Sequence, residues 1–88
     1  MKILGKEVEP VEAGPTYRRW STVVGIFLAT VKQDTVAGLC TWDLSLDGGL
    51  MMVDGGHVKS SDPEEAVREL NRAAKRVLGE HDTIRRLP

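Results

Sequence analysis

The residues best suited to binding or chemistry gather in one glycine-rich stretch of the chain. The triplet Asp-Gly-Gly occurs there twice, at 47–49 and at 54–56, and His57 directly follows the second copy. Carboxylates beside glycine-rich backbone can bind calcium, but the EF-hand loop needs alternating acidic ligands and a closing glutamate, which this stretch lacks. Glycine reaches positive φ at no steric cost, so each triplet is suited to turning the chain. We expect the first triplet to close a hairpin and the second to lead the chain out of the sheet.

Histidine and cysteine are too few and too scattered for a metal site or a catalytic pair. The chain holds two histidines, His57 and His81, and a single cysteine, Cys40, and no second ligand follows at zinc-site spacing. A pair of His57 with Cys40 or with Ser60, as base and nucleophile, lacks an accompanying oxyanion loop. We therefore expect no catalytic residue, no metal and no cofactor, and a protein that is not an enzyme.

Three resemblances to known families follow from these motifs and from the order of the elements. Residues 53–56, Val-Asp-Gly-Gly, are similar to a stretch near the end of short-chain dehydrogenases, but 88 residues cannot hold the dinucleotide fold of that family. Strands followed by a helix over 22–79 resemble the later part of a double-stranded-RNA-binding domain. Where that family has phosphate-gripping lysines, this helix begins with Asp62, Glu64 and Glu65. The same layout resembles antitoxins of the HicB kind, which carry a further dimerisation or DNA-binding segment.

Length and composition indicate one small domain over residues 1–88. A formal net charge of −1, with 41% hydrophobic and 28% charged residues, is ordinary for a folded domain and gives no overall attraction to phosphate or anionic lipid. The longest apolar run, at 23–31, is shorter than a bilayer requires, and the first residues lack the apolar core of a signal peptide. A single cysteine excludes an internal disulfide, so we expect a cytoplasmic protein without membrane contact.

Strand patterns dominate the first two thirds of the chain. We expect strands at 3–8, 20–32, 36–46 and 50–53. Pro10, Gly14 and Pro15 predict a loop at 9–16 and loose order over 1–16. The run 20–32 reads as one central strand with a bulge at Gly25, and a polar turn at 32–35 follows it.

The C-terminal third predicts one helix over about 62–79, followed by a tail at 80–88. Asp62 is suited to cap the helix, Glu65 to complete a capping box, and Gly79 to end it. Apolar residues recur there at three- and four-residue steps and form a stripe that can lie on a sheet. The predicted fold class is α+β, an antiparallel meander of three or four strands packed on one face by a single C-terminal helix.

The apolar and aromatic residues exceed what one helix on one sheet face can bury. We expect the other face to bind a partner protein or a second copy of the chain, unless the N-terminal segment folds over it. The leading hypothesis is a non-enzymatic protein-binding module that occupies a surface of a larger protein, as accessory proteins and phage inhibitors such as anti-CRISPRs do. The predicted protein-binding residues are Tyr17, Arg18, Arg19, Trp20, Trp42, Met51 and Met52.

Two alternatives to this hypothesis stay open. A local basic surface in the C-terminal third favours nucleic-acid binding, which would weaken steeply as salt is added. The residues predicted for this alternative are Arg68, Arg72, Lys75, Arg76, Arg85 and Arg86. The second alternative is an antitoxin-like component, which the layout of strands and helix suggests.

Overall fold

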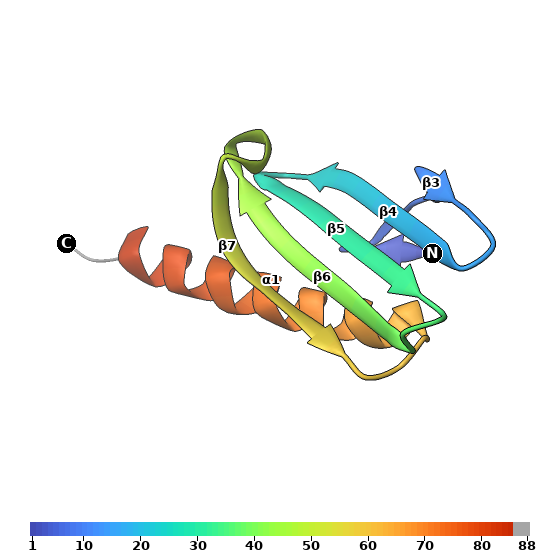
Figure 1. The fold of residues 1–88 in the computed structure, drawn as a ribbon. Coiled ribbons are helices and arrows are strands. Elements are labelled where there is room, and N and C mark those ends of the chain that lie inside the picture. Colours follow the sequence, from blue (N-terminus) through green and yellow to red (C-terminus); the bar gives the residue numbers. More distant parts are fainter. Residues whose placement is uncertain (86–88) are drawn as a thin grey trace.

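The chain forms a small hairpin, a five-stranded sheet and one long helix, in that order (Figure 1). The computed structural model describes the backbone of residues 1–85 and the side chains of residues 1–79. The elements are β1 (Lys2–Ile3), β2 (Lys6–Glu7), β3 (Glu12–Ala13), β4 (Tyr17–Val24), β5 (Phe27–Asp34), β6 (Leu39–Leu46), the 3₁₀ turn η1 (Asp47–Gly49), β7 (Met51–Val58) and α1 (Pro63–Arg85). The predicted α+β class is confirmed.

The main sheet is an antiparallel meander in which each strand pairs with its neighbour in sequence, in the order β3-β4-β5-β6-β7. The meander was predicted correctly, but the expected number of three or four strands is too small. The run 20–32 is not one strand, because Gly25 and Ile26 form a two-residue turn that sets Val24 opposite Phe27. Gly25 has a φ of +59°, which suits the first central position of a tight hairpin and is disfavoured for residues with a Cβ.

Aspartate and glycine residues form the β5–β6 and β6–β7 turns. β5 continues through residues 32–34, so the turn lies at 35–38 and the predicted turn at 32–35 is displaced. The Asp34 carboxylate accepts hydrogen bonds from the backbone N–H groups of Val36 (3.0 Å) and Ala37 (2.9 Å), as aspartate does at turns. The first Asp-Gly-Gly closes the β6–β7 hairpin, as predicted, and all three of its residues have positive φ.

The second Asp-Gly-Gly does not leave the sheet, and this prediction was wrong. It lies inside β7, with Gly55 opposite Asp43 and Gly56 opposite Trp42. A Cβ on Gly56 would lie 3.1 to 3.2 Å from atoms of the Trp42 indole, closer than an ordinary van der Waals contact. Gly56 therefore leaves room for the tryptophan ring of the neighbouring strand, which is a packing role and not a turn.

α1 begins where the sequence predicts and ends later. The Asp62 carboxylate accepts from the Glu64 backbone N–H at 3.0 Å, which confirms the cap, while the Asp62 N–H donates to the Ser60 hydroxyl at 3.1 Å. The helix continues through Gly79 to Arg85, so Gly79 does not end it. A glycine inside a helix costs only about 1 kcal/mol relative to alanine, which this helix tolerates.

One face of the sheet carries the core and the other is open. α1 covers the inner face, and the β1–β2 hairpin packs beside it on the same face (Figure 1), where Ile3 is fully buried and the Leu4 N–H donates to Asn71 Oδ1 at 3.2 Å. The core consists of Ile3, Val8, Trp20, Phe27, Ala29, Val31, Cys40, Trp42, Leu44, Ala66, Val67, Leu70, Ala73 and Ala74. Because the hairpin joins the helix side, the N-terminal residues do not cover the outer face.

Candidate functional site

The two tryptophans predicted to anchor a partner lie in the core. Trp20 is 5% exposed and Trp42 is 8% exposed, and the two flank Val31 on the inner face of the sheet. Phe27, which is 3% exposed, is buried on the same face, beneath the helix and the N-terminal hairpin. The burial of these three aromatic residues accounts for part of the excess of apolar residues in the sequence. Neither indole is available to a partner in this fold.

The remaining aromatic and the two adjacent arginines lie at the β3 side of the sheet. Tyr17 is partly buried on the outer face, opposite Asp34. Arg19 shares that face, and its Nη2 donates to Glu12 Oε1 of β3 at 2.7 Å, so its charge is already paired. Arg18 alternates to the other face and is exposed. These three residues do not form one surface with Met51 and Met52, because they lie on β4 and the methionines lie three strands away on β7.

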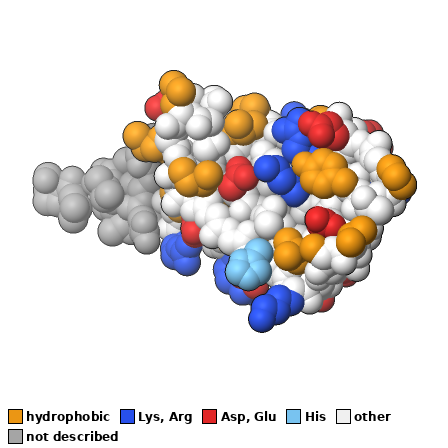
Figure 2. All heavy atoms as spheres, in the orientation of Figure 1, with side chains coloured by type: hydrophobic (Ala, Val, Ile, Leu, Met, Phe, Trp, Pro, Cys, Tyr) orange, Lys and Arg blue, Asp and Glu red, His pale blue; other side chains and the backbone are white. Residues whose placement is uncertain are grey.

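The centre of the outer face is polar, contrary to the expectation of an apolar docking face. Across the strands, Arg19, Lys32, Thr41 and His57 form one row, and basic, acidic and hydrophobic side chains are interspersed there (Figure 2). Asp43 belongs to the next row, where burial raises its pKa while Lys32 opposes the rise. A face with such mixed and partly paired charges has no apolar area for docking at its centre.

Exposed apolar side chains gather instead at one end of the molecule. The β4–β5 turn and η1 lie side by side there (Figure 1), and a Cβ on Gly49 would lie 3.3 Å from Leu28 Cδ2. Of the eight large hydrophobic residues that are exposed in the described part of the chain, six belong to this end. They are Val23, Ile26, Leu50, Met51, Met52 and Leu78, with exposed fractions of 45% to 90%. We call these six residues the apolar end.

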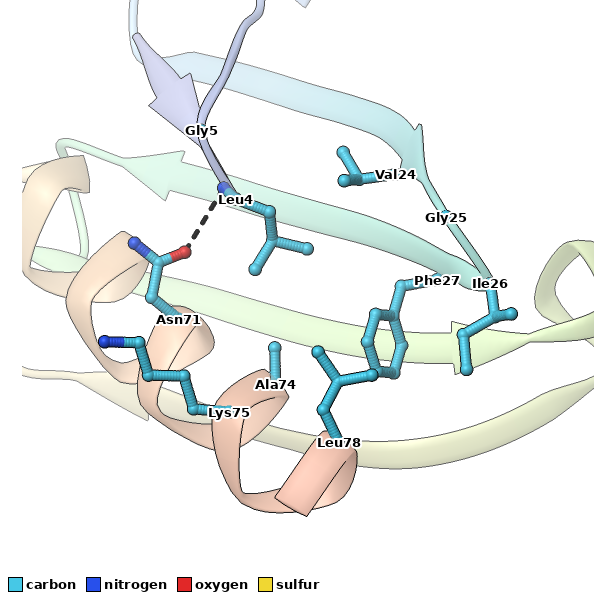
Figure 3. A pocket seen from close by; sticks show the side chains of 10 residues that line it. All are labelled: Leu4, Gly5, Val24, Gly25, Ile26, Phe27, Asn71, Ala74, Lys75 and Leu78. Carbon is cyan, nitrogen blue, oxygen red and sulfur yellow. Dashed lines mark hydrogen bonds between the residues drawn. The ribbon is translucent and has the colours of Figure 1, made fainter. Parts of the chain in front are cut away.

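A cavity of about 450 Å³ opens at the apolar end between α1, the β1–β2 turn and the β4–β5 turn (Figure 3). Figure 3 shows Leu4, Phe27 and Leu78 around it, with Ile26 at the β4–β5 turn. Asn71 is fixed at one side because its Oδ1 accepts from the Leu4 N–H. Small-molecule and side-chain pockets are of this size and are mostly apolar.

Sequence reasoning found only the methionines of this site. Val23 and Ile26 were missed because Gly25 was interpreted as a bulge inside one strand, and Leu50 and Leu78 were missed because they were assigned to a strand and to the buried stripe of the helix. The signal that could have found them is the pair Gly25-Ile26 between two β-branched runs, which is typical of a two-residue hairpin with an exposed second residue. Once the hairpin is recognised, strand alternation places Val23 on the outer face, in the same cross-strand row as Met52.

The arginines predicted for nucleic acid are engaged by carboxylates along α1. Arg72 pairs with Glu69 at 3.1 Å, Arg68 lies 3.9 Å from Glu65, and Arg76 pairs with Asp54 of β7. Lys75 lines the cavity instead. The side chains of Arg85 and Arg86 lie outside the described residues.

The groups considered for chemistry are dispersed. Cys40 is fully buried, and burial raises the pKa of its thiol, with Asp62 and Glu65 adding to the effect. His57 is exposed on the outer face of β7, and the side chain of His81 lies outside the described part. No group of three His, Cys, Asp or Glu side chains that could hold a metal ion occurs among the residues described.

Comparison with known proteins adds no assignment. No protein family, no curated protein and no solved structure matches this chain. Within the described residues, no helix is both long and apolar enough to cross a bilayer.

Proposed function

We propose that this chain is a non-enzymatic protein-binding module that docks through its apolar end. The observation that carries the proposal is the gathering of six exposed hydrophobic side chains at one end of the sheet. Large exposed apolar patches on a soluble protein mark interaction surfaces, and these six residues make this end the most apolar part of the described surface. Met51 and Met52 add flexible side chains that adapt to a partner surface.

The cavity supplies a specific contact within this surface. Its walls come from Leu4 of the β1–β2 turn, Phe27 of β5 and Leu78 of α1, so the cavity is present in the chain without a partner. A partner residue such as leucine or phenylalanine that enters this cavity would bury much of its side chain against apolar walls, as residues that dominate the binding energy of an interface do. Lys75 at the lining favours a partner with a carboxylate beside that residue.

A module of this kind acts by occupying a surface of a larger protein, as an accessory protein or a phage-type inhibitor does. Nucleic-acid binding has less support, because the carboxylates of Glu65, Glu69 and Asp54 lie among the arginines of α1 and make this surface mixed in charge, where phosphate binding needs a basic surface. Binding of that kind would also show a steep dependence on salt.

Differential affinity capture tests the proposal. The tagged chain, Ile26→Asp and Met52→Asp would be compared for the proteins that each retains from nuclease-treated lysate, with Val36→Asp as the matched control. Val36 is 80% exposed in the β5–β6 turn, at the opposite end of the sheet. We expect a protein that is retained by the unmodified chain and by Val36→Asp and lost with the other two variants.

The capture is then repeated with purified partner. A charge placed in a desolvated apolar contact should weaken binding at least about tenfold, which corresponds to about 1.4 kcal/mol. Equal retention by all four proteins, or loss with Val36→Asp as well, would contradict docking at the apolar end.

A further inference from the structure

The two edges of the sheet differ in a way that points to a second interaction surface. β3 is two residues long, and Pro10 and Pro15 flank it, so this edge offers few backbone groups for pairing. β7 is eight residues long, contains no proline or lysine and has a register shift at Val53, and no strand of the described residues lies on its outer side. Natural proteins usually protect such an edge, because its unpaired N–H and C=O groups can accept another strand.

We propose that two copies of the chain pair through β7 in antiparallel orientation. The two five-stranded sheets then become one sheet of ten strands, with both helices on the same face. From Asp54 to Val58, beyond the register shift at Val53, every second residue of β7 directs its backbone N–H and C=O away from β6, and these groups become paired in the dimer. Gly55 and Gly56, near the middle of β7, are exposed and have no side chain that would obstruct a second strand.

The charges along one side of α1 indicate that the strand that pairs with β7 belongs to a second copy of this chain. Glu65, Glu69, Arg72 and Arg76 recur at steps of four, three and four residues and therefore share one side of the helix, which we call the charge ladder. The contact of Arg76 with Asp54 shows that the charge ladder faces the β7 edge. The ladder is acidic in its first half and basic in its second half, so it is complementary to an antiparallel copy of itself.

The register follows from the same contacts. Residues 59–62 are the whole connection between β7 and α1, so the helix runs back along β7. The midpoint of the charge ladder lies about 8 Å along the helix from Arg76, at about 1.5 Å per residue. At about 3.4 Å per strand residue, this distance places the two-fold axis roughly two to three residues from Asp54, near Gly56 and His57.

The separation of the helices fits pairing through long side chains. α1 lies along β6 and also contacts β5 and β7. Three strand spacings separate β6 from its copy, which places the two helix axes about 14 Å apart. Arg72 and Arg76 of one copy can then reach Glu65 and Glu69 of the other. Their present ion pairs are solvent-exposed and cost little to exchange.

Sedimentation equilibrium of the purified chain, from about 1 µM to about 1 mM, tests whether it self-associates. We expect a monomer–dimer equilibrium. A chain that stays monomeric at every concentration would overturn the proposal. The partner of β7 would then be a strand from a different protein. The docking of a partner at the apolar end would be unaffected, so the two proposals fail separately.

Disulfide trapping locates the contact. His57→Cys places a thiol beside the expected axis, whereas Lys32→Cys places one on the same face but two strands away from the edge. We expect rapid oxidation to a covalent dimer with His57→Cys and none with Lys32→Cys, since the native Cys40 is fully buried. Equal trapping of the two variants would overturn the β7 contact.

Charge exchange tests the pairing of the helices. The double variant Glu65→Arg with Glu69→Arg makes the charge ladder wholly basic, and Arg72→Glu makes it mainly acidic while keeping the Arg76 contact with Asp54. We expect each variant alone to dimerise at least about tenfold more weakly, and an equimolar mixture to form a heterodimer at low salt. Circular dichroism confirms that both variants fold. If the mixture associates no better than either variant alone, the ladder does not select a second copy.

Discussion

Substitution of Gly56 by alanine should destabilise the protein, although alanine ordinarily suits a strand better than glycine. The intrinsic gain of alanine over glycine is about 0.5 to 1 kcal/mol. Against this, the new Cβ would lie 3.1 Å from Trp42 Nε1 and 3.2 Å from Cε2 and Cζ2, and excess volume of this kind in a packed region costs typically about 1 to 3 kcal/mol. We expect a net loss of about 1 to 2 kcal/mol in the free energy of unfolding.

Thermal unfolding followed by circular dichroism measures this loss. In a domain of this size, about 1 kcal/mol shifts the midpoint by about 4 to 8 °C, so Gly56→Ala should unfold roughly 5 to 15 °C below the unmodified protein. The matched control is Gly79→Ala in α1, where a Cβ meets nothing within 4 Å. That variant should be more stable by about 1 kcal/mol, because glycine is a poor helix former.

A double-mutant cycle with Trp42→Phe isolates the cause. Phenylalanine has no counterpart of the indole Nε1, so the penalty for Gly56→Ala should shrink by about 1 kcal/mol in that background. The reasoning is refuted if Gly56→Ala is as stable as the unmodified protein, or if it costs the same with either ring at position 42.

Three further predictions concern the cap, a carboxylate and the cysteine. Asp62→Ala should lower the free energy of unfolding by about 1 kcal/mol in urea titrations, while Asp62→Asn should keep most of the cap. Burial raises the pKa of Asp43, so the native state binds the proton more tightly and stability falls as the pH rises above the ordinary value of 3.8. Asp43→Asn should therefore raise the melting temperature at pH 7 and give no such advantage well below pH 3.8, and an equal gain at both pH values would argue against a charge effect. Cys40, whose thiol pKa is raised by burial, should react with a thiol reagent only as fast as the chain unfolds, so rapid labelling of the native protein would contradict its burial.

The sequence predicted the class of fold because its strongest local signals agree with the tertiary structure. The capping aspartate, the apolar stripe of α1 and the alternation of residues 40–44 each have one physical interpretation, and the structure has all three. The central hairpin was missed because Val23, Val24 and Phe27 are good strand residues on both sides of Gly25, and the turn has no polar residue to mark it.

The candidate site was harder to predict because it consists of the apolar residues that are not buried in the core. Trp20 and Trp42 were reasonable anchors by residue type, but both are buried in the core, and small residues of α1 such as Ala73 allow the helix to pack closely against Trp42. Gly56 contributes to the same burial, and its contact with Trp42 joins residues that are far apart in sequence. Hydrophobic patterns along the chain contain no information about such a contact until the strand register is known.

The order of the elements along the chain also bears on how the protein folds during its synthesis. Each strand of the meander pairs with a neighbour that leaves the ribosome just before it, so the sheet can form progressively from local contacts. The helix that packs against Trp42 is the last of the described elements to emerge, because it begins at Pro63. Until then the nascent sheet exposes Trp42 to solvent, and a chaperone that recognises exposed apolar surface would find its target in this interval. Arrest of translation before α1 has left the exit tunnel should therefore give chains with solvent-exposed tryptophan fluorescence, and release of the helix should abolish it.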